Sequence, residues 1–198
     1  MARTVAKDHD QKRLHILKTA AGVFAREGYA RSSMAQVASA CGISKANIYH
    51  YYPGKDALLF DILNTYLSAL RDNLLSIQAE GVSPEERLQA FTRATLSAYQ
   101  VMEAEHQIQA EGVPLLPEEQ QVTLKNYQRE IVRALNEILL EISPQAFENN
   151  KSKLRATSMS VFGMLNSYAM WNKQVEPAAR AKYADLVSDL VINGSRAL

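Results

Sequence analysis

Residues 32–52 read SSMAQVASACGISKANIYHYY, and apolar or small residues recur along this stretch at helical spacing. These residues are Met34, Val37, Ala38, Ile43 and Ile48. Cys41-Gly42 interrupts the spacing where a tight turn would fall, which predicts two short helices that meet at an angle. Ser33 and Ser44 each precede a helical run, where a hydroxyl can accept a hydrogen bond from an unpaired backbone amide. The stretch therefore predicts a helix-turn-helix.

The second predicted helix is unusually rich in polar and amphipathic side chains. They are Lys45, Asn47, Tyr49, His50 and Tyr51. A helix of this kind buries little surface and suits the major groove of DNA, where Asn or Lys reads base edges. Tyrosine hydroxyls and lysine ammonium groups bind phosphate oxygens in the same setting. The helix is therefore predicted to contact double-stranded DNA.

The wider pattern resembles the DNA-binding signature of the tetracycline-repressor (TetR) family, over roughly residues 10–60. The matching positions are Phe24, Gly28-Tyr29, Ser33-Met34, Val37-Ala38, Cys41-Gly42-Ile43-Ser44-Lys45, Ile48-Tyr49, Tyr52 and Lys55-Asp56-Ala57-Leu58. Two departures are mild: Cys41 stands where the family commonly has Ala, and Tyr52 where it commonly has Phe.

The resemblance implies an all-α fold with two domains. A three-helix DNA-binding domain is expected in residues 1–54, and a helical domain that binds an effector and dimerises in residues 55–198. The resemblance assigns DNA contacts to Ser33, Ser44, Lys45, Ala46, Asn47, Tyr49, His50, Tyr51 and Lys55. Lys55 is expected to bind a phosphate. A dimer with two such helices would recognise a near-palindromic operator, with half-sites about one helical turn apart or somewhat more.

Composition places the chain among soluble globular proteins. It has 198 residues, of which 47% are hydrophobic and 22% charged. No apolar run is long enough for a membrane span, and residues 1–13 lack a secretory signal, so we expect a cytoplasmic protein with no membrane partner. The single cysteine, Cys41, excludes an internal disulfide and any multi-cysteine metal site. We expect no metal and no cofactor.

Charge is unevenly distributed along the chain. Residues 1–60 hold nine Lys or Arg against four Asp or Glu, whereas the remainder carries a net charge of −4. A basic region that coincides with a helix-turn-helix favours binding to phosphate groups. The acidic remainder of the chain is expected to face a partner other than these phosphate groups.

Apolar periodicity and helix breakers define the other elements. The predicted helices span residues 10–27, 55–80, 84–105, 118–142 and 151–173, with a terminal helix around 183–194. Residues 1–9 are predicted to form a mobile arm along the DNA backbone, or simply a frayed terminus. Residues 106–117 contain Gly112, Pro114 and Pro117 and are predicted to be irregular.

The last two predicted helices carry small residues and a regular apolar stripe. The small residues are Ala156, Ser158, Ser160, Gly163 and Ser167, and the stripe is Tyr183, Leu186, Val187, Leu190, Val191 and Gly194. Such faces favour a four-helix bundle with a second copy of the chain, as the TetR resemblance also implies. The alternative is that both helices complete the core of a single chain.

Aromatic, polar and methionine side chains in the C-terminal part are candidates for an effector pocket. They are Phe91, Thr95, Tyr99, Met102, Tyr127, Phe162, Asn166 and Met170. At helical spacing such residues more often belong to a core. Residues 162–166, followed by Trp171, are similar to a segment in TetR-type regulators of fatty-acid, phenylacetate or sterol breakdown, several of which sense CoA thioesters. An acyl- or aryl-CoA effector is therefore expected, with a hydrophobic drug or an aromatic acid as the alternative.

Other classes of function fit the sequence less well. An enzyme is not expected, because the four histidines lie in no metal-ligand spacing and no nucleophile motif or phosphate-binding loop is present. A protein that coats DNA without sequence preference would not need the long C-terminal part. A repressor of a drug-efflux operon, or an activator, remains open at this point.

Overall fold

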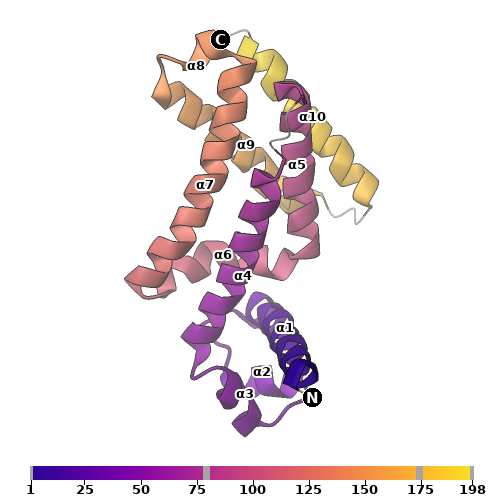
Figure 1. Cartoon of the computed structure of the whole chain (residues 1–198), viewed down its shortest axis with the longest axis vertical. Coiled ribbons are helices and arrows are strands. Elements are labelled where there is room, and N and C mark those ends of the chain that lie inside the picture. The colour runs from indigo at the N-terminus through magenta and orange to yellow at the C-terminus, as the bar shows by residue number, and fades with distance from the viewer. Residues whose placement is uncertain (1, 78–80, 173–175, 197–198) are drawn as a thin grey trace. The chain divides into compact units, whose positions relative to one another are not determined.

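The structure is a computed structural model that describes residues 2–77, 81–172 and 176–196, and within them it contains helices and no strands. This confirms the predicted all-α fold (Figure 1). The elements are α1 (Ala2–Glu27), α2 (Met34–Ala40), α3 (Lys45–Tyr51), α4 (Lys55–Leu75), α5 (Pro84–Val101), α6 (Glu103–Gly112), the 3₁₀ helix η1 (Val113–Leu115), α7 (Glu118–Ile142), α8 (Pro144–Phe147), α9 (Lys151–Trp171) and α10 (Pro177–Arg196).

The chain divides into two compact units. The first comprises Met1–Ser68 and Met102–Lys125, and the second comprises Ala69–Val101 and Asn126–Leu198. Helices α4 and α7 therefore contribute residues to both units. The expected domain boundary at residue 54 stays a prediction.

The core of the first unit forms on the apolar stripe of α1. Ile16, Ala20, Val23 and Phe24 are all buried, which confirms the predicted stripe. Helix α1 packs against both α2 and α6. Since α1 packs against α2, it helps to hold the helix-turn-helix in position.

Local signals in the sequence fix both ends of α2. The Ser33 hydroxyl accepts a hydrogen bond from the Gln36 amide at 3.2 Å, and the Gln36 side chain accepts one from the Ser33 amide at 2.8 Å, so the two residues form a capping box. At the other end, the amide of Ile43 bonds to the carbonyl of Ala38 and the amide of Gly42 to that of Ser39. These two bonds make a Schellman motif, which ends the helix and directs the chain into α3.

Gly42 is the residue that this turn most requires. Its φ of +68° lies in the left-handed region, which residues with a Cβ rarely adopt. We expect Gly42→Ala to lower the free energy of unfolding by about 1 kcal/mol, measured by urea denaturation. Gly42→Asn should cost less, because Asn tolerates this backbone conformation. Equal losses for the two variants would contradict this account.

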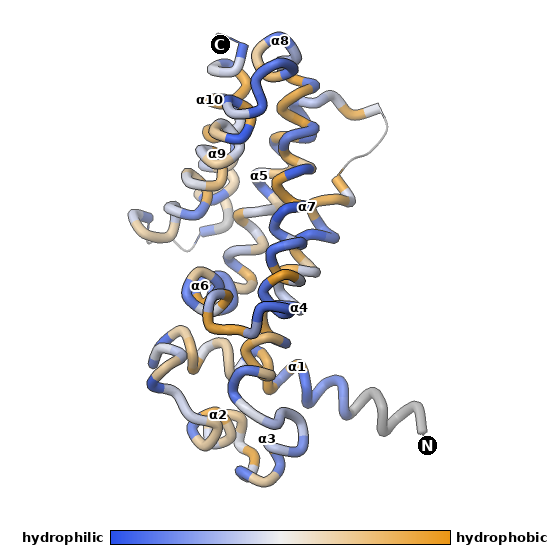
Figure 2. Tube along the Cα trace, turned by 90° about the vertical axis from the view of Figure 1, so that its left-hand side faces the viewer, coloured by the Kyte–Doolittle hydropathy of each residue, from blue (hydrophilic) through white to orange (hydrophobic). Residues whose placement is uncertain are grey.

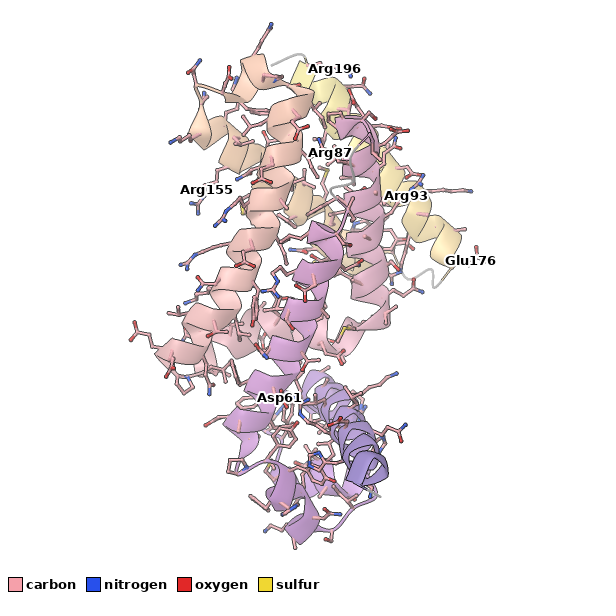
Figure 3. All side chains as sticks on the ribbon, in the orientation of Figure 1. Asp61, Arg87, Arg93, Arg155, Glu176 and Arg196 are labelled. Carbon is pink, nitrogen blue, oxygen red and sulfur yellow. The ribbon has the colours of Figure 1, made fainter. Side chains whose placement is uncertain are left out.

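A partly buried polar network ties the end of α3 to α1 and α4. The Tyr52 hydroxyl donates to Asp61 at 2.5 Å, and the Arg13 guanidinium donates to both carboxylate oxygens of Asp61 (Figure 3). Burial raises the pKa of Tyr52, and the bond to Asp61 raises it further, so the phenol stays protonated and able to donate. The network connects residues far apart in the sequence and holds α3 at a fixed place.

The structure corrects the prediction for residues 1–9. Helix α1 begins at Ala2, so within the described residues there is no separate arm. Residues such as Ala2, Arg3, Ala6 and Lys7 have high helix propensity, and no Gly or Pro interrupts them, so the helix extends toward the amino terminus. The predicted ends of two other helices, at residues 80 and 173, lie outside the described residues.

The prediction that residues 106–117 are irregular is wrong for most of this segment. Helix α5 ends at Val101, and α6 runs from Glu103 to Gly112 before η1 follows. Gly112 is the last residue of α6, so the predicted breakers stand at the end of this helix and after it. A Cβ at Gly112 would lie 3.3 Å from side-chain atoms of both Leu59 and Leu63 of α4. The glycine is explained by a close contact with α4.

Helix α6 also carries a half-buried histidine. The Nδ1 atom of His106 lies 3.1 Å from the hydroxyl of the fully buried Tyr66. Burial lowers the pKa of His106 to about 4, so the ring is neutral at pH 7. A neutral ring can accept the phenol proton at Nδ1, which links α6 to α4.

The second unit is built around α5, α9 and α10, which pack on one another. Between α5 and α10, the hydroxyls of Thr92 and Ser188 lie 2.8 Å apart and both are buried. The bounds predicted for α7 are confirmed, and Figure 2 shows hydrophobic and hydrophilic residues alternating along this helix, as an amphipathic helix requires.

Ion pairs surround this core. They are Arg87–Glu141, Arg93–Asp185 and Arg196–Glu85, with the three arginines labelled in Figure 3. They connect α5 to α7 and to the middle and the C-terminal end of α10. Exposed pairs of this kind contribute little stability but favour one register of the helices.

Candidate nucleic-acid interface

Helix α3 presents almost all of its side chains to solvent. Lys45, Ala46, Asn47 and His50 are exposed, and Tyr49 is 44% exposed. Among the residues that the structure describes, none forms a hydrogen bond or ion pair with the side chains of Lys45, Asn47 or Tyr49. These polar atoms are therefore available to a partner outside the chain.

The exposed face is held by residues at three points of the helix. Ile48 is fully buried and anchors the middle of α3, and Tyr52 is buried just beyond its last residue. At the start, the Ser44 hydroxyl accepts a hydrogen bond from the Asn47 amide at 3.1 Å. The helix is thus fixed without using the side chains that face outward.

Tyr51 differs from its neighbours because it is half-buried. Its ring stacks on the ring of His9 of α1, with centroids 5.0 Å apart and an interplanar angle of 26°. The His50 ring meets it edge-on at 5.9 Å. The ring is therefore contacted by two histidines, one of which the sequence analysis did not select.

The two serines predicted to contact DNA both cap helices. Ser33 begins α2 and Ser44 begins α3, and in each the hydroxyl oxygen accepts an amide hydrogen bond within the chain. The Ser33 hydroxyl also donates to Gln36 at 3.0 Å. Capping is thus an observed role of both residues, and their DNA contacts stay a prediction.

Lys55 lies in a different environment from the one the sequence suggested. Its ammonium group donates to the carbonyls of Tyr29, Ala30 and Ser32, at 2.7, 3.3 and 2.8 Å, and lies 4.4 Å from the centroid of the Tyr29 ring. An ammonium has three N–H groups, and these three carbonyls match them. In this structure Lys55 closes the loop between α1 and α2, so its predicted phosphate contact would have to replace one of these bonds.

Three of the predicted effector residues lie together in the second unit. The rings of Phe91 and Phe162 have centroids 6.3 Å apart and meet at 66°. Thr95 is fully buried one turn from Phe91, and its hydroxyl donates to the Phe91 carbonyl at 2.8 Å. This group joins α5 to α9.

The next predicted effector residues are Tyr99, Tyr127 and Met102. Tyr99 is half-buried on α5, and burial raises its pKa. On α7, the Tyr127 ring lies under the guanidinium of Arg71, which is 4.5 Å from the ring centroid. Met102 lies between α5 and α6 and belongs to the first unit.

Asn166 and Met170 lie on the exposed face of α9, and Met170 is 84% exposed. Both side chains therefore lie outside the core of the chain, and their contact with an effector stays a prediction. Helical spacing places residues on a common face but does not say whether the face turns inward. Here the inward face of α9 carries Leu154, Val161 and Leu165.

A shallow cavity of about 380 Å³ lies on α9 and α10. It is lined by Lys153, Ala156, Thr157, Ser160, Leu190, Val191, Gly194 and Ser195, and by none of the predicted effector residues. Several of these residues belong to the small-residue and apolar stripes that the sequence analysis assigned to dimerisation. The cavity therefore marks that face and not the expected effector pocket.

Two family models match the chain and together span most of it. Residues 16–62 match "Bacterial regulatory proteins, tetR family" and residues 81–195 match "Tetracyclin repressor-like, C-terminal domain". The second match alone covers more than half of the chain. The chain belongs to the TetR family.

Solved structures of TetR-family proteins resemble the chain over nearly its full length. A TetR-family transcriptional regulator from Bordetella parapertussis 12822 is 28% identical, with a TM-score of 0.84 over 90% of this chain and 93% of that chain. The regulator AibR, solved in complex with isovaleryl coenzyme A and operator DNA, is 26% identical, with a TM-score of 0.75 over 90% and 97%.

Among curated relatives, the "Uncharacterized HTH-type transcriptional regulator YuxN" of Bacillus subtilis (strain 168) is 39% identical over 74 residues, which are 37% of this chain and 25% of that protein. The chain spans between 25% and 63% of the length of the curated relatives it matches. The relatives are named as transcriptional regulators, and the TetR family is a DNA-binding family that is not enzymatic.

Two further features bear on the partners of this TetR-family protein. Along the described residues, no helix is both long enough and apolar enough to cross a bilayer. Over the same residues, no group of three or more His, Cys, Asp or Glu side chains is arranged to hold a metal ion.

The different surroundings of Lys45 and Lys55 lead to a testable contrast. We expect Lys55→Met to lower the free energy of unfolding by about 2 kcal/mol, because three hydrogen bonds to a charged donor are lost. Lys45→Met should leave the free energy of unfolding unchanged. It should reduce by about one the slope of the logarithm of DNA affinity against the logarithm of salt concentration. Thermal unfolding and affinity titrations over a range of salt concentrations measure the two effects. If Lys55→Met left the free energy of unfolding unchanged, the three hydrogen bonds of Lys55 would contribute little to stability.

Proposed function

We propose that this TetR-family protein is a ligand-responsive transcriptional repressor that binds a near-palindromic operator as a homodimer. The observation that carries the proposal is the outward face of α3, where the side chains of Lys45, Asn47 and Tyr49 have no partner among the described residues. An amide on such a helix can bond two edge atoms of an adenine, and a lysine can bond guanine or phosphate.

The exposed face of α9 and α10 supports the dimer. On α10 the predicted stripe divides in two: Val187 and Val191 are buried within the chain, whereas Leu186 and Leu190 are 51% and 56% exposed. The α9 residues Ala156, Ser160 and Gly163 are exposed as well, and their small size allows a close approach by another helix. We propose that a second copy covers this face, including the 380 Å³ cavity.

Another of the small residues on α9, Ser158, belongs to the chain's own core. Ser158 is buried and donates to Asn136 of α7 at 2.5 Å. One side of each of these two helices completes the core of the chain. We propose that the other side contacts a second copy, so that both interpretations of the last two helices hold, each for a different face.

For the effector we propose an acyl- or aryl-CoA thioester. The support is the likeness to AibR, whose structure contains isovaleryl coenzyme A, together with the aromatic group of Phe91 and Phe162 in the effector-binding part of the chain. An aromatic pair with a nearby hydroxyl suits the acyl or aryl portion of such a ligand. A hydrophobic drug or an aromatic acid, as in a repressor of drug efflux, is the alternative that the test below separates.

Release from the operator follows from ligand-dependent selection of a conformation. An effector that binds better to a dimer with the wrong spacing of its two α3 helices would shift the population away from DNA binding. The shift can be no larger than the difference in effector affinity between the two conformations. No covalent step is required.

Selection from a random double-stranded DNA library, followed by footprinting, tests the DNA-binding part of the proposal. We expect enrichment of one near-palindromic sequence and a discrete footprint on it. Uniform protection without enrichment would instead identify a protein that coats DNA. Once an operator is defined, transcription from a promoter that carries it distinguishes repression from activation.

The effector is tested with isovaleryl-CoA, phenylacetyl-CoA and longer acyl-CoAs, each compared with free CoA and with the corresponding free acid. We expect a thioester to raise the thermal midpoint and to release the operator, while free CoA does neither. Release by a free aromatic acid or a hydrophobic drug would support the alternative. No response to any thioester would exclude the CoA proposal.

A further inference from the structure

We infer that His9 of α1 is a positioning residue for DNA recognition, which acts by holding the ring of Tyr51 on α3. The inference rests on the proposed function, because it concerns how the same surface discriminates between DNA sequences. It adds to that surface a residue 42 positions before Tyr51, outside the helix-turn-helix itself.

The contact between the two rings has the geometry of an aromatic stack. Their centroids are 5.0 Å apart and their planes differ by 26°, within the range of favourable offset stacking. His50 meets the same tyrosine edge-on at 5.9 Å and 86°. Tyr51 is therefore contacted on its face by α1 and at its edge by its own helix.

Neither ring is placed as a core residue would be. The His9 side chain is 55% exposed, with its Nδ1 atom 3.9 Å from Asp10, and Tyr51 is half-buried. Among the described residues, the Tyr51 hydroxyl has no hydrogen-bond partner. The stack thus holds the Tyr51 ring and leaves its hydroxyl available to a partner outside the chain, on the same helix as Asn47.

A fixed ring contributes to specificity in a way that a mobile one does not. When a side chain is already held in its bound orientation, less conformational entropy is lost on binding, and DNA that does not fit that orientation is rejected. Loss of His9 should therefore reduce discrimination between operators and not merely total affinity. His50 alone would leave the face of the Tyr51 ring unsupported.

The test compares His9→Ala, which removes the stack, with His9→Phe, which retains an aromatic ring. Gln11→Ala is the control, since Gln11 is an exposed residue of the same helix. The probes are the operator selected by the unaltered protein and a set of its single-base-pair variants. Affinity for each is measured at fixed salt, and thermal midpoints are recorded for every protein.

For His9→Ala we expect discrimination to fall about three- to tenfold at the one or two base pairs nearest Tyr51, as the loss of an aromatic pair implies. His9→Phe should restore it, and Gln11→Ala should not change it. In a Tyr51→Ala background, His9→Ala should have no further effect, because the histidine acts through the tyrosine.

Three results would overturn the inference. An equal loss of affinity for all sequences with a lowered thermal midpoint would show a purely structural role for His9. An additive effect of His9→Ala in the Tyr51→Ala background would show that the histidine acts independently. Unchanged discrimination in His9→Ala would show that the histidine has no role. A separate outcome, in which the unaltered protein selects no sequence, would overturn the proposed function and the inference with it.

Discussion

Asn47→Ala is expected to reduce discrimination between the operator and its single-base-pair variants by about ten- to a hundredfold. A side-chain amide that bonds two edge atoms of adenine contributes roughly 1–3 kcal/mol of discrimination against the wrong base. The Asn47 side chain is exposed and has no partner among the described residues, so its loss should leave the thermal midpoint unchanged. Affinity measurements on the operator variants, with thermal unfolding of each protein, check both parts.

Asn47→Gln is the matched variant, because it keeps the amide but moves it outward by one methylene. We expect it to alter the preferred base instead of abolishing preference. If Asn47→Ala retained both operator affinity and base preference, α3 would not be the reading helix, and the proposed orientation of the protein on DNA would be wrong.

Leu190→Asp is expected to convert the protein to a monomer and to weaken operator binding by at least about a hundredfold. The side chain is 56% exposed beside the cavity on α9 and α10, and a carboxylate placed there would lose its hydration when a second copy covers the face. A monomer engages one half-site, so the gain from simultaneous binding of two sites is lost. Sedimentation velocity and operator titrations measure the two effects.

Val122→Asp provides the control, since Val122 is also an exposed apolar residue but belongs to α7 and not to α9 or α10. It should leave both the oligomeric state and operator affinity unchanged. A Leu190→Asp protein that remained dimeric would place the dimer interface elsewhere on the surface.

The helix-turn-helix could be predicted because its signals are local. Ser33 and Ser44 cap helices that begin directly after them, and Gly42 supplies the left-handed backbone conformation that ends α2. Each of these effects depends on residues within about one helical turn. Sequence reading is strongest for such features.

Other features depend on contacts between distant segments. The role of Gly112 appears only when α6 packs against Leu59 and Leu63, and the sequence suggested an irregular segment where α6 leads up to this glycine. Similarly, Lys55 bonds to carbonyls between 23 and 26 residues away, and nothing in the spacing of the chain indicates that contact. His9 was missed for the same reason.

The effector residues illustrate a further limit. Phe91, Thr95 and Phe162 come together, but Met170 lies on an outward face although it shares the residue type of a typical pocket. Composition and periodicity identify a helical face, whereas the direction in which that face turns is set by the packing of α5, α9 and α10.

The residues that hold α3 and those that project from it are different residues. Ile48, Tyr52 and the Ser44 cap anchor the helix, while Lys45, Asn47 and Tyr49 extend from it without internal bonds among the described residues. Mutational drift at the projecting positions can therefore proceed without loss of folding. Duplicated copies of such a gene could diverge toward separate regulatory circuits, and regulators with altered DNA preference could be sought by exchanging those three side chains.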